Sequence, residues 1–172
     1  MKLLSTATLA FVLAGCAGMQ ASNPVVSVLV DLDPTSTERT MIVESITADQ
    51  TGVLYMPDRV TGNILRVDPK SPKPVVVAKV EARMVDGKKV DALPGGILFD
   101  AQGDLYVAAG PFSEVMRIKG ADLNPARPGV AQTFATGVPG ANGIAFDKQG
   151  NLYISGGASG IVYRVAPNGG AA

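Results

Sequence analysis

One frame of four residues occurs three times in this chain of 172 residues. In each copy an Asp is followed by Gly at the third position after it, Tyr at the sixth and Arg at the seventeenth. The copies are Asp49, Gly52, Tyr55 and Arg66; Asp100, Gly103, Tyr106 and Arg117; and Asp147, Gly150, Tyr153 and Arg164. Their Asp anchors lie 51 and 47 residues apart. A strand-like repeat with a period of about 40–50 residues is typical of propeller blades, so the sequence predicts an all-β fold of stacked copies.

Each copy reads as antiparallel strands separated by turns. An Asp can accept a hydrogen bond from the backbone two residues on, and Gly supplies the positive φ that closes such a turn. An apolar run precedes the turn, a second strand holds the Tyr, and a third holds the Arg, with the alternation of half-buried strands. Outer fourth strands are expected at residues 75–78 and 131–135. For the third copy no outer strand is expected, because the sequence ends at Ala172 before one. We expect the Tyr and Arg to serve packing and cross-strand pairing, and Asp58, Arg59 and Asp68 to be solvated turn residues.

The N-terminal segment has the features of an export signal. A short basic start is followed by an apolar run at residues 3–13, too short to span a bilayer, and by Leu-Ala-Gly before Cys16. This pattern resembles the bacterial lipobox, in which the Cys is lipidated, although an ordinary secretory signal cleaved nearby is the alternative. We therefore expect a signal peptide at 1–15, lipidation at Cys16 and a tether at 16–23. By resemblance to Gram-negative lipoproteins, the protein would face the periplasm from the outer membrane. The propeller blades would occupy 24–172, as copies at about 42–93, 94–138 and 139–172, with a first strand at 25–30.

Composition excludes several classes of function. The chain has 15 basic and 15 acidic side chains, so there is no basic field for nucleic acid. It has no histidine, which rules out a Ser-His-Asp triad or a His-ligated metal within one chain. The single cysteine is assigned to the anchor. Carboxylate and amide oxygens remain, and these suit a hard cation such as calcium.

Residues 142–154, Asn-Gly-Ile-Ala-Phe-Asp-Lys-Gln-Gly-Asn-Leu-Tyr-Ile, resemble a blade of six-bladed propellers. The resemblance is to the senescence-marker-protein/gluconolactonase/luciferin-regenerating-enzyme family and to the broader NHL-type group. It extends over about residues 42–167, and residues 44–68 are similar to the opening blade of the first family. It implies a partial propeller of about three four-stranded antiparallel blades, and is less specific for activity.

Glu44, Gly95 and Asn142 each lie five residues before an anchor Asp. In a propeller, equivalent positions at the start of each inner strand converge on the central axis, so these residues would face one cavity. In the gluconolactonase-like family this position supplies oxygen ligands to a divalent cation, and Glu44 and Asn142 match two of them. Gly95 offers no side-chain oxygen, and the late Asp that serves as general base has no counterpart. If these two residues do not bind a cation, Glu44 would be a residue at the start of a strand and Asn142 a residue that forms the turn before Gly143.

Closed propellers have about four to eight blades, because closure removes exposed sheet edges. Three copies leave three explanations open. The chain is a shortened propeller, or two chains pair as a homodimer that closes a six-bladed ring, or the sheet is open and buries its edges in another way.

Two function classes follow from these features. The first is an exported, lipid-anchored, calcium-dependent hydrolase of lactone or sugar-like substrates, in which Glu44 and Asn142 hold the cation. The second is a propeller that binds a small molecule or another partner without chemistry. A shortened propeller without independent activity is the third interpretation.

Overall fold

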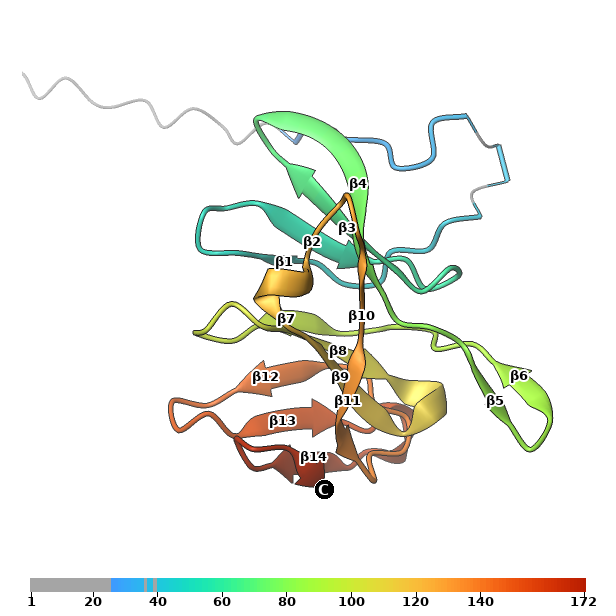
Figure 1. The fold of residues 1–172 in the computed structure, drawn as a ribbon, viewed down its shortest axis with the longest axis vertical. Helices are drawn as coiled ribbons and strands as arrows, with labels where there is room; N and C mark the ends of the chain where they lie inside the picture. Colours follow the sequence, from blue (N-terminus) through green and yellow to red (C-terminus); the bar gives the residue numbers. More distant parts are fainter. Residues whose placement is uncertain (1–25, 36, 39) are drawn as a thin grey trace, which may run out of the picture.

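The computed structural model describes residues 26–35, 37–38 and 40–172. The expected signal peptide, Cys16 and the whole tether at 16–23 lie outside these residues. Within them, the chain forms three mainly antiparallel sheets arranged as a fan, together with a separate two-stranded sheet (Figure 1). No helix among them is long and apolar enough to cross a membrane. The prediction of an all-β partial propeller is confirmed.

The first blade contains the first copy of the repeat. Its strands are β1 (Thr47–Ala48), β2 (Leu54–Pro57), β3 (Asn63–Asp68) and β4 (Ser71–Lys79), and they pair in that order. The predicted outer strand at 75–78 falls inside β4. Strand β10 (Gly129–Val130) adds to the outer edge of β4 in a parallel sense.

The second blade repeats this order. Its strands are β7 (Ile97–Phe99), β8 (Leu105–Ala109), β9 (Glu114–Ile118) and β11 (Gln132–Thr136). Strand β11 covers most of the predicted outer strand at 131–135. Strand β15 (Gly170–Ala171) pairs in parallel with the outer edge of β11.

The third blade has three strands among the described residues. These are β12 (Ile144–Phe146), β13 (Leu152–Ser155) and β14 (Val162–Val165). After β14 the chain runs to the second blade, where it forms β15. No strand of the described part of the chain therefore pairs with the outer edge of β14.

The remaining elements lie between the strands of the blades or between the blades. Strands β5 (Arg83–Val85) and β6 (Lys88–Val90) form a separate hairpin between the first two blades. Single 3₁₀ turns occur at η1 (Gly110–Phe112), η2 (Gly120–Asp122) and η3 (Gly157–Ser159).

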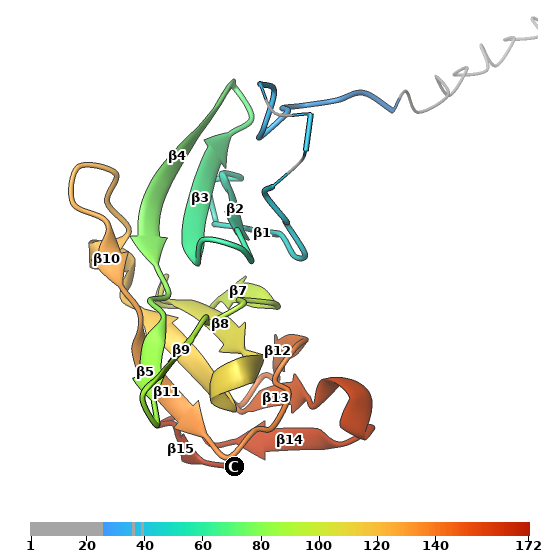
Figure 2. The same ribbon diagram turned by 90° about the vertical axis from the view of Figure 1, so that its right-hand side faces the viewer.

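The inner strands of the blades converge. Strand β1 contacts β7, and β7 contacts β12. The backbone N–H of Gly96 donates a hydrogen bond of 2.9 Å to the carbonyl oxygen of Asn142, which ties the second blade to the third. Figure 2 shows β1, β7 and β12 gathered on one side of the fan, with β4, β10, β11 and β15 on the other. This convergence is the hub that the sequence predicts.

Apolar side chains fill both seams between blades. Between the first and second blades the core includes Tyr55, Ile64, Val77, Leu105, Val107 and Met116. Between the second and third it includes Tyr106, Val115, Ala135, Leu152, Ile154 and Val165. A smaller cluster lies on the far face of the first blade, where Val30, Leu32 and Met41 cover Met56, Leu65 and Val67.

The expected first strand at 25–30 is wrong in its described part. Residues 26–30 form no strand, and Val26, Val28 and Leu29 are exposed. The outer edge of the first blade, where an extra strand could pair, is already taken by β10.

Candidate functional site

The Asp and Gly of the repeat build turns. Oδ1 of Asp49 accepts hydrogen bonds from the backbone N–H groups of Thr51 and Val53, at 2.8 and 3.1 Å. Asp100 and Asp147 each accept the two corresponding bonds at 2.9 Å. The Gly three positions after each Asp has a φ of 82–86°, in the left-handed region. These residues therefore close the hairpin of each blade, as the sequence predicts.

The Tyr and Arg of the repeat pair across strands. Tyr55 lies opposite Arg66, and the other two copies have the same register. Two of the three Tyr side chains also reach the next blade: Tyr55 meets the Phe99 ring edge-on with centroids 4.9 Å apart, and Tyr106 meets Phe146 at 5.0 Å. The repeat is therefore explained by folding, and a binding site must be sought among other residues.

The carboxylates of these turns make the free energy of unfolding depend on pH. Partial burial would raise the pKa of Asp49, but hydrogen bonds from the Thr51 side chain and backbone, Val53 and Tyr55 together hold it below its ordinary value. The side chain of Asn151 is the largest cause of the lowered pKa of Asp147. A depressed pKa in the folded state stabilises the protein above the unfolded value of 3.8, and this contribution is lost as pH falls through the folded pKa.

We expect the free energy of unfolding to decrease as pH is lowered below about 4, and Asp49→Asn to flatten that decrease. Urea unfolding at a series of pH values between neutral and about pH 3 measures both effects. Glu81→Gln, a change at an exposed carboxylate, is the control and should leave the slope unchanged. If the free energy of unfolding fell equally with pH in the wild type and in Asp49→Asn, the Asp49 carboxylate would not be a source of the pH dependence.

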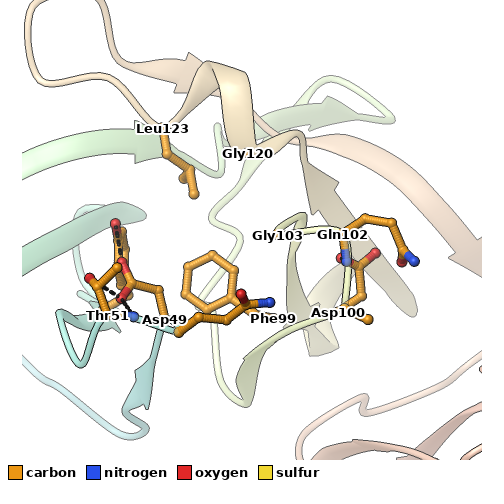
Figure 3. Close-up of a pocket in the computed structure, with 11 residues that line it drawn as sticks. Asp49, Thr51, Phe99, Asp100, Gln102, Gly103, Gly120 and Leu123 are labelled. Carbon is orange, nitrogen blue, oxygen red and sulfur yellow. Dashed lines mark hydrogen bonds between the residues drawn. The ribbon is translucent and has the colours of Figure 1, made fainter.

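The hollows at the turn end of the hub follow the repeat. One of about 400 Å³ lies between the first two blades, where Phe99 stands between the turns of Asp49 and Asp100 with Leu123 beside it (Figure 3). An equivalent hollow of about 510 Å³ lies between the second and third blades. The Asp carboxylates there are bonded to their own turns.

The opposite end of the hub presents Glu44. Its exposed carboxylate accepts a hydrogen bond from Nη1 of Arg59, and both side chains are 37% exposed. Arg59 lies in the turn between β2 and β3, and its backbone N–H donates to the Ile42 carbonyl oxygen at 2.8 Å. Glu44 is therefore held beside a fixed cation, which the sequence did not predict.

The turn that holds Arg59 is built on Asp58. The expectation that Asp58 is solvated is wrong: its side chain is buried, at 1% exposure. It accepts hydrogen bonds from the backbone N–H of Ile42 and Val60, at 3.3 and 3.0 Å, and from the Thr61 hydroxyl. The Thr and Gly that closely follow this Asp are a turn signal that could have revealed its role.

Asn142 stands at the same end of the third inner strand. Its side chain is exposed, and its backbone N–H donates to the Ser155 carbonyl oxygen at 3.0 Å. A Cβ on Gly95 would lie 3.3 Å from Oδ1 of Asn142, so the amide covers the glycine of the second blade. Asn142 and Gly95 are thus neighbours, while Glu44 enters on the adjoining first inner strand.

A polar hollow of about 300 Å³ adjoins Arg59. Lys79, Lys89 and Asp91 also line it, and the Lys89 ammonium lies 2.7 Å from Oδ1 of Asp91. The hub end of the first blade thus offers hydrogen-bond donors of positive charge beside the Glu44 carboxylate. Such a surface suits a small polar molecule that both accepts and donates hydrogen bonds.

The donors at this end do not make a calcium site in one chain. Calcium takes about six to eight oxygens, and the chain brings one carboxylate and one amide to equivalent positions. The carboxylate of Glu44 is already paired with Arg59. Among the described residues no three His, Cys, Asp or Glu side chains group closely enough to hold a metal ion.

No family model matches the chain, and no curated protein matches it. Solved structures do. The chain is similar to virginiamycin B lyase from Staphylococcus aureus, with 13% identity, a TM-score of 0.52, and coverage of 76% of this chain and 43% of the lyase. It is similar to the aldose sugar dehydrogenase of Streptomyces coelicolor, with 19% identity, a TM-score of 0.53, and coverage of 73% and 45%.

It is also similar to a gluconolactonase from Xanthomonas campestris, with 16% identity, a TM-score of 0.53, and coverage of 73% of this chain and 44% of that protein. The chain spans less than half the length of these three proteins. At such low identity the likeness shows the fold alone. The class is that of a β-propeller protein, present here as three blades.

Proposed function

We propose that this protein is an exported, lipid-anchored propeller that binds a small polar ligand, lactone or sugar-like in class, at the hub end that carries Glu44 and Asn142. The observation that supports this most is the convergence of the inner strands, because it brings exposed polar side chains of separate blades to one end of the fan. Glu44 would accept hydrogen bonds from ligand hydroxyl groups. Arg59 and the amide of Asn142 would donate to ring or carbonyl oxygens.

Export and anchoring rest on the first 16 residues. The apolar run that ends before Cys16 supports cleavage there and lipidation of the thiol, with the protein on the periplasmic face of the outer membrane. Fractionation of cells that express the full chain tests this, because Cys16→Ser should move the protein out of the membrane fraction. Equal membrane association of both forms would contradict the anchor.

Hydrolysis of a lactone is the second candidate. It is favoured by the carboxylate and amide at equivalent positions of two blades, and by the fold that the chain shares with a gluconolactonase. A bound calcium ion would act as a Lewis acid on the lactone carbonyl. The residues of one chain do not fit that ion, so binding without chemistry agrees better with the geometry.

Calorimetric titration of the purified chain with D-glucono-1,5-lactone tests the binding proposal. Glu44→Gln and Asn142→Ala should each weaken binding about fivefold or more, since the first replaces a charged acceptor by a weaker neutral one and the second removes a donor, each change being worth about 1 kcal/mol. Glu81→Gln should not change the affinity. Absence of binding to the wild type, or equal binding by all variants, would overturn the proposal for this ligand class.

The same samples test the metal. We expect calcium to leave the melting temperature of the single chain unchanged. A ligand at a hundred times its dissociation constant adds about 2.7 kcal/mol, which is readily detected. A rise in melting temperature that Glu44→Gln abolishes would establish the cation site and favour the hydrolase.

A further inference from the structure

The two ends of the fan are incomplete in complementary ways. The third blade has a sheet edge without a partner strand among the described residues, and the segment at 26–30 has a strand-like sequence without a sheet. Unpaired edges present rows of free N–H and C=O groups, which favour the addition of a strand. The two features therefore fit each other.

The free edge of the third blade is apolar and exposed. Val162 on β14 is 68% exposed and Ile161 just before it is 51% exposed. Tyr153 is 36% exposed, whereas Tyr55 and Tyr106, at the same repeat position, are buried against the next blade. The side of the third blade that a fourth blade would cover thus faces solvent.

The segment at 26–30 reads Val-Ser-Val-Leu-Val, which has high strand propensity. Val26 and Val28 are 98% and 85% exposed, which a settled strand of this composition would avoid. The segment also packs loosely on the first blade, because a hollow of about 410 Å³ remains among Val28, Val30 and Met41. Oδ2 of Asp33, next along the chain, is buried without a hydrogen-bond partner.

The segment and the free edge cannot meet within one fan. The segment lies beside the first blade and β14 belongs to the third, at opposite ends of the molecule (Figure 1). A second copy related by a two-fold axis would present its segment to β14 and receive the first copy's segment in return. Such a contact is self-complementary and closed.

We propose that two copies of this chain form a ring of six blades, in which residues 26–30 of each copy pair with β14 of the other. Each exchanged segment supplies the fourth strand of a third blade, and each first blade covers a Tyr153. The ring removes the sheet edges that a three-bladed fan exposes. It also surrounds the hub with six inner strands and brings both copies of Glu44 and Asn142 to it. This inference does not depend on which ligand the hub binds.

Sedimentation velocity of the purified chain at micromolar concentration tests the ring. We expect twice the chain mass of 17.6 kDa. Val28→Lys and Val162→Lys should each convert the dimer to monomer. Met84→Lys is the matched control, since Met84 is 69% exposed on the β5–β6 hairpin and lies outside the proposed contact. A monomeric wild type, or a dimer that neither lysine variant disrupts, would overturn the proposal.

Cross-linking distinguishes reciprocal exchange from another dimer. Two chains that lack Cys16 are mixed, one with Val28→Cys and the other with Val162→Cys, and are then oxidised. We expect a disulfide between the unlike chains, because neighbouring strands lie about 5 Å apart. Met84→Cys mixed with Val162→Cys should not link. A dimer that links the control pair equally well would contradict the exchange of strands.

Discussion

Gly96→Ala should destabilise the protein by about 2–3 kcal/mol and loosen the hub. A Cβ at this position would lie 2.3 Å from the carbonyl oxygen of Asn142 and 3.1 Å from Cα of Gly143. Both atoms belong to the backbone of the third blade, so no side-chain rotation can relieve the contact. The same change would disturb the hydrogen bond from Gly96 to Asn142. Urea unfolding at neutral pH measures the loss.

The neighbouring glycine is the control for this prediction. A Cβ on Gly95 would meet the side-chain oxygen of Asn142 at 3.3 Å, and that side chain is exposed and can move. Gly95→Ala should therefore cost less than about 1 kcal/mol. Equal losses in the two variants would show that the second and third blades do not touch through Gly96.

Tyr106→Ala should cost about 3–5 kcal/mol, the range for removing a large aromatic side chain from a core. Tyr106 is 4% exposed and contacts two rings edge-on, Phe134 of its own blade at 4.8 Å and Phe146 of the next at 5.0 Å. Its loss would leave a cavity in the seam between the second and third blades. Chemical denaturation followed by far-ultraviolet circular dichroism gives the change in stability.

Tyr106→Phe separates the ring from the hydroxyl. Both ring contacts remain in this variant, so we expect a loss of no more than about 1 kcal/mol. Burial raises the pKa of the Tyr106 phenol, so the hydroxyl stays protonated over the neutral range. If Tyr106→Phe and Tyr106→Ala destabilised the protein equally, the stability of the seam would not depend on the ring contacts.

The repeat predicted the blades because turn chemistry and alternation are local. Asp49 and Gly52 specify a hairpin turn wherever they occur, and the position of Tyr55 on β2 then fixes its partner, Arg66, on β3. The parallel additions of β10 and β15 are not local, since they depend on which outer edges the finished fan leaves open. For the same reason a strand-like sequence at 26–30 did not yield a strand.

At the candidate site the sequence predicted one contact and missed another. Equal spacing from the anchor Asp was enough to bring Asn142 and Gly95 together at the hub. The pairing of Glu44 with Arg59 was not predicted, because it depends on how the buried Asp58 folds the turn between two strands. The Thr and Gly that follow Asp58 signal the turn, but composition and periodicity do not show that its carboxylate is buried.

A disulfide between Gly95→Cys and Asn142→Cys tests the central claim, that the inner strands meet at one hub, most directly. A Cβ at position 95 would lie 3.8 Å from Cα of Asn142, which is close enough for the two Cβ atoms to reach the separation of about 3.5–4.5 Å that a disulfide requires. In a chain that lacks Cys16, mild oxidation should give an intramolecular bond, detected as a mass loss of about two hydrogens in the monomeric chain. Gly95→Cys with Lys148→Cys, at the far end of the third inner strand, should stay reduced. Free thiols in the first pair, or equal oxidation of both pairs, would contradict the hub.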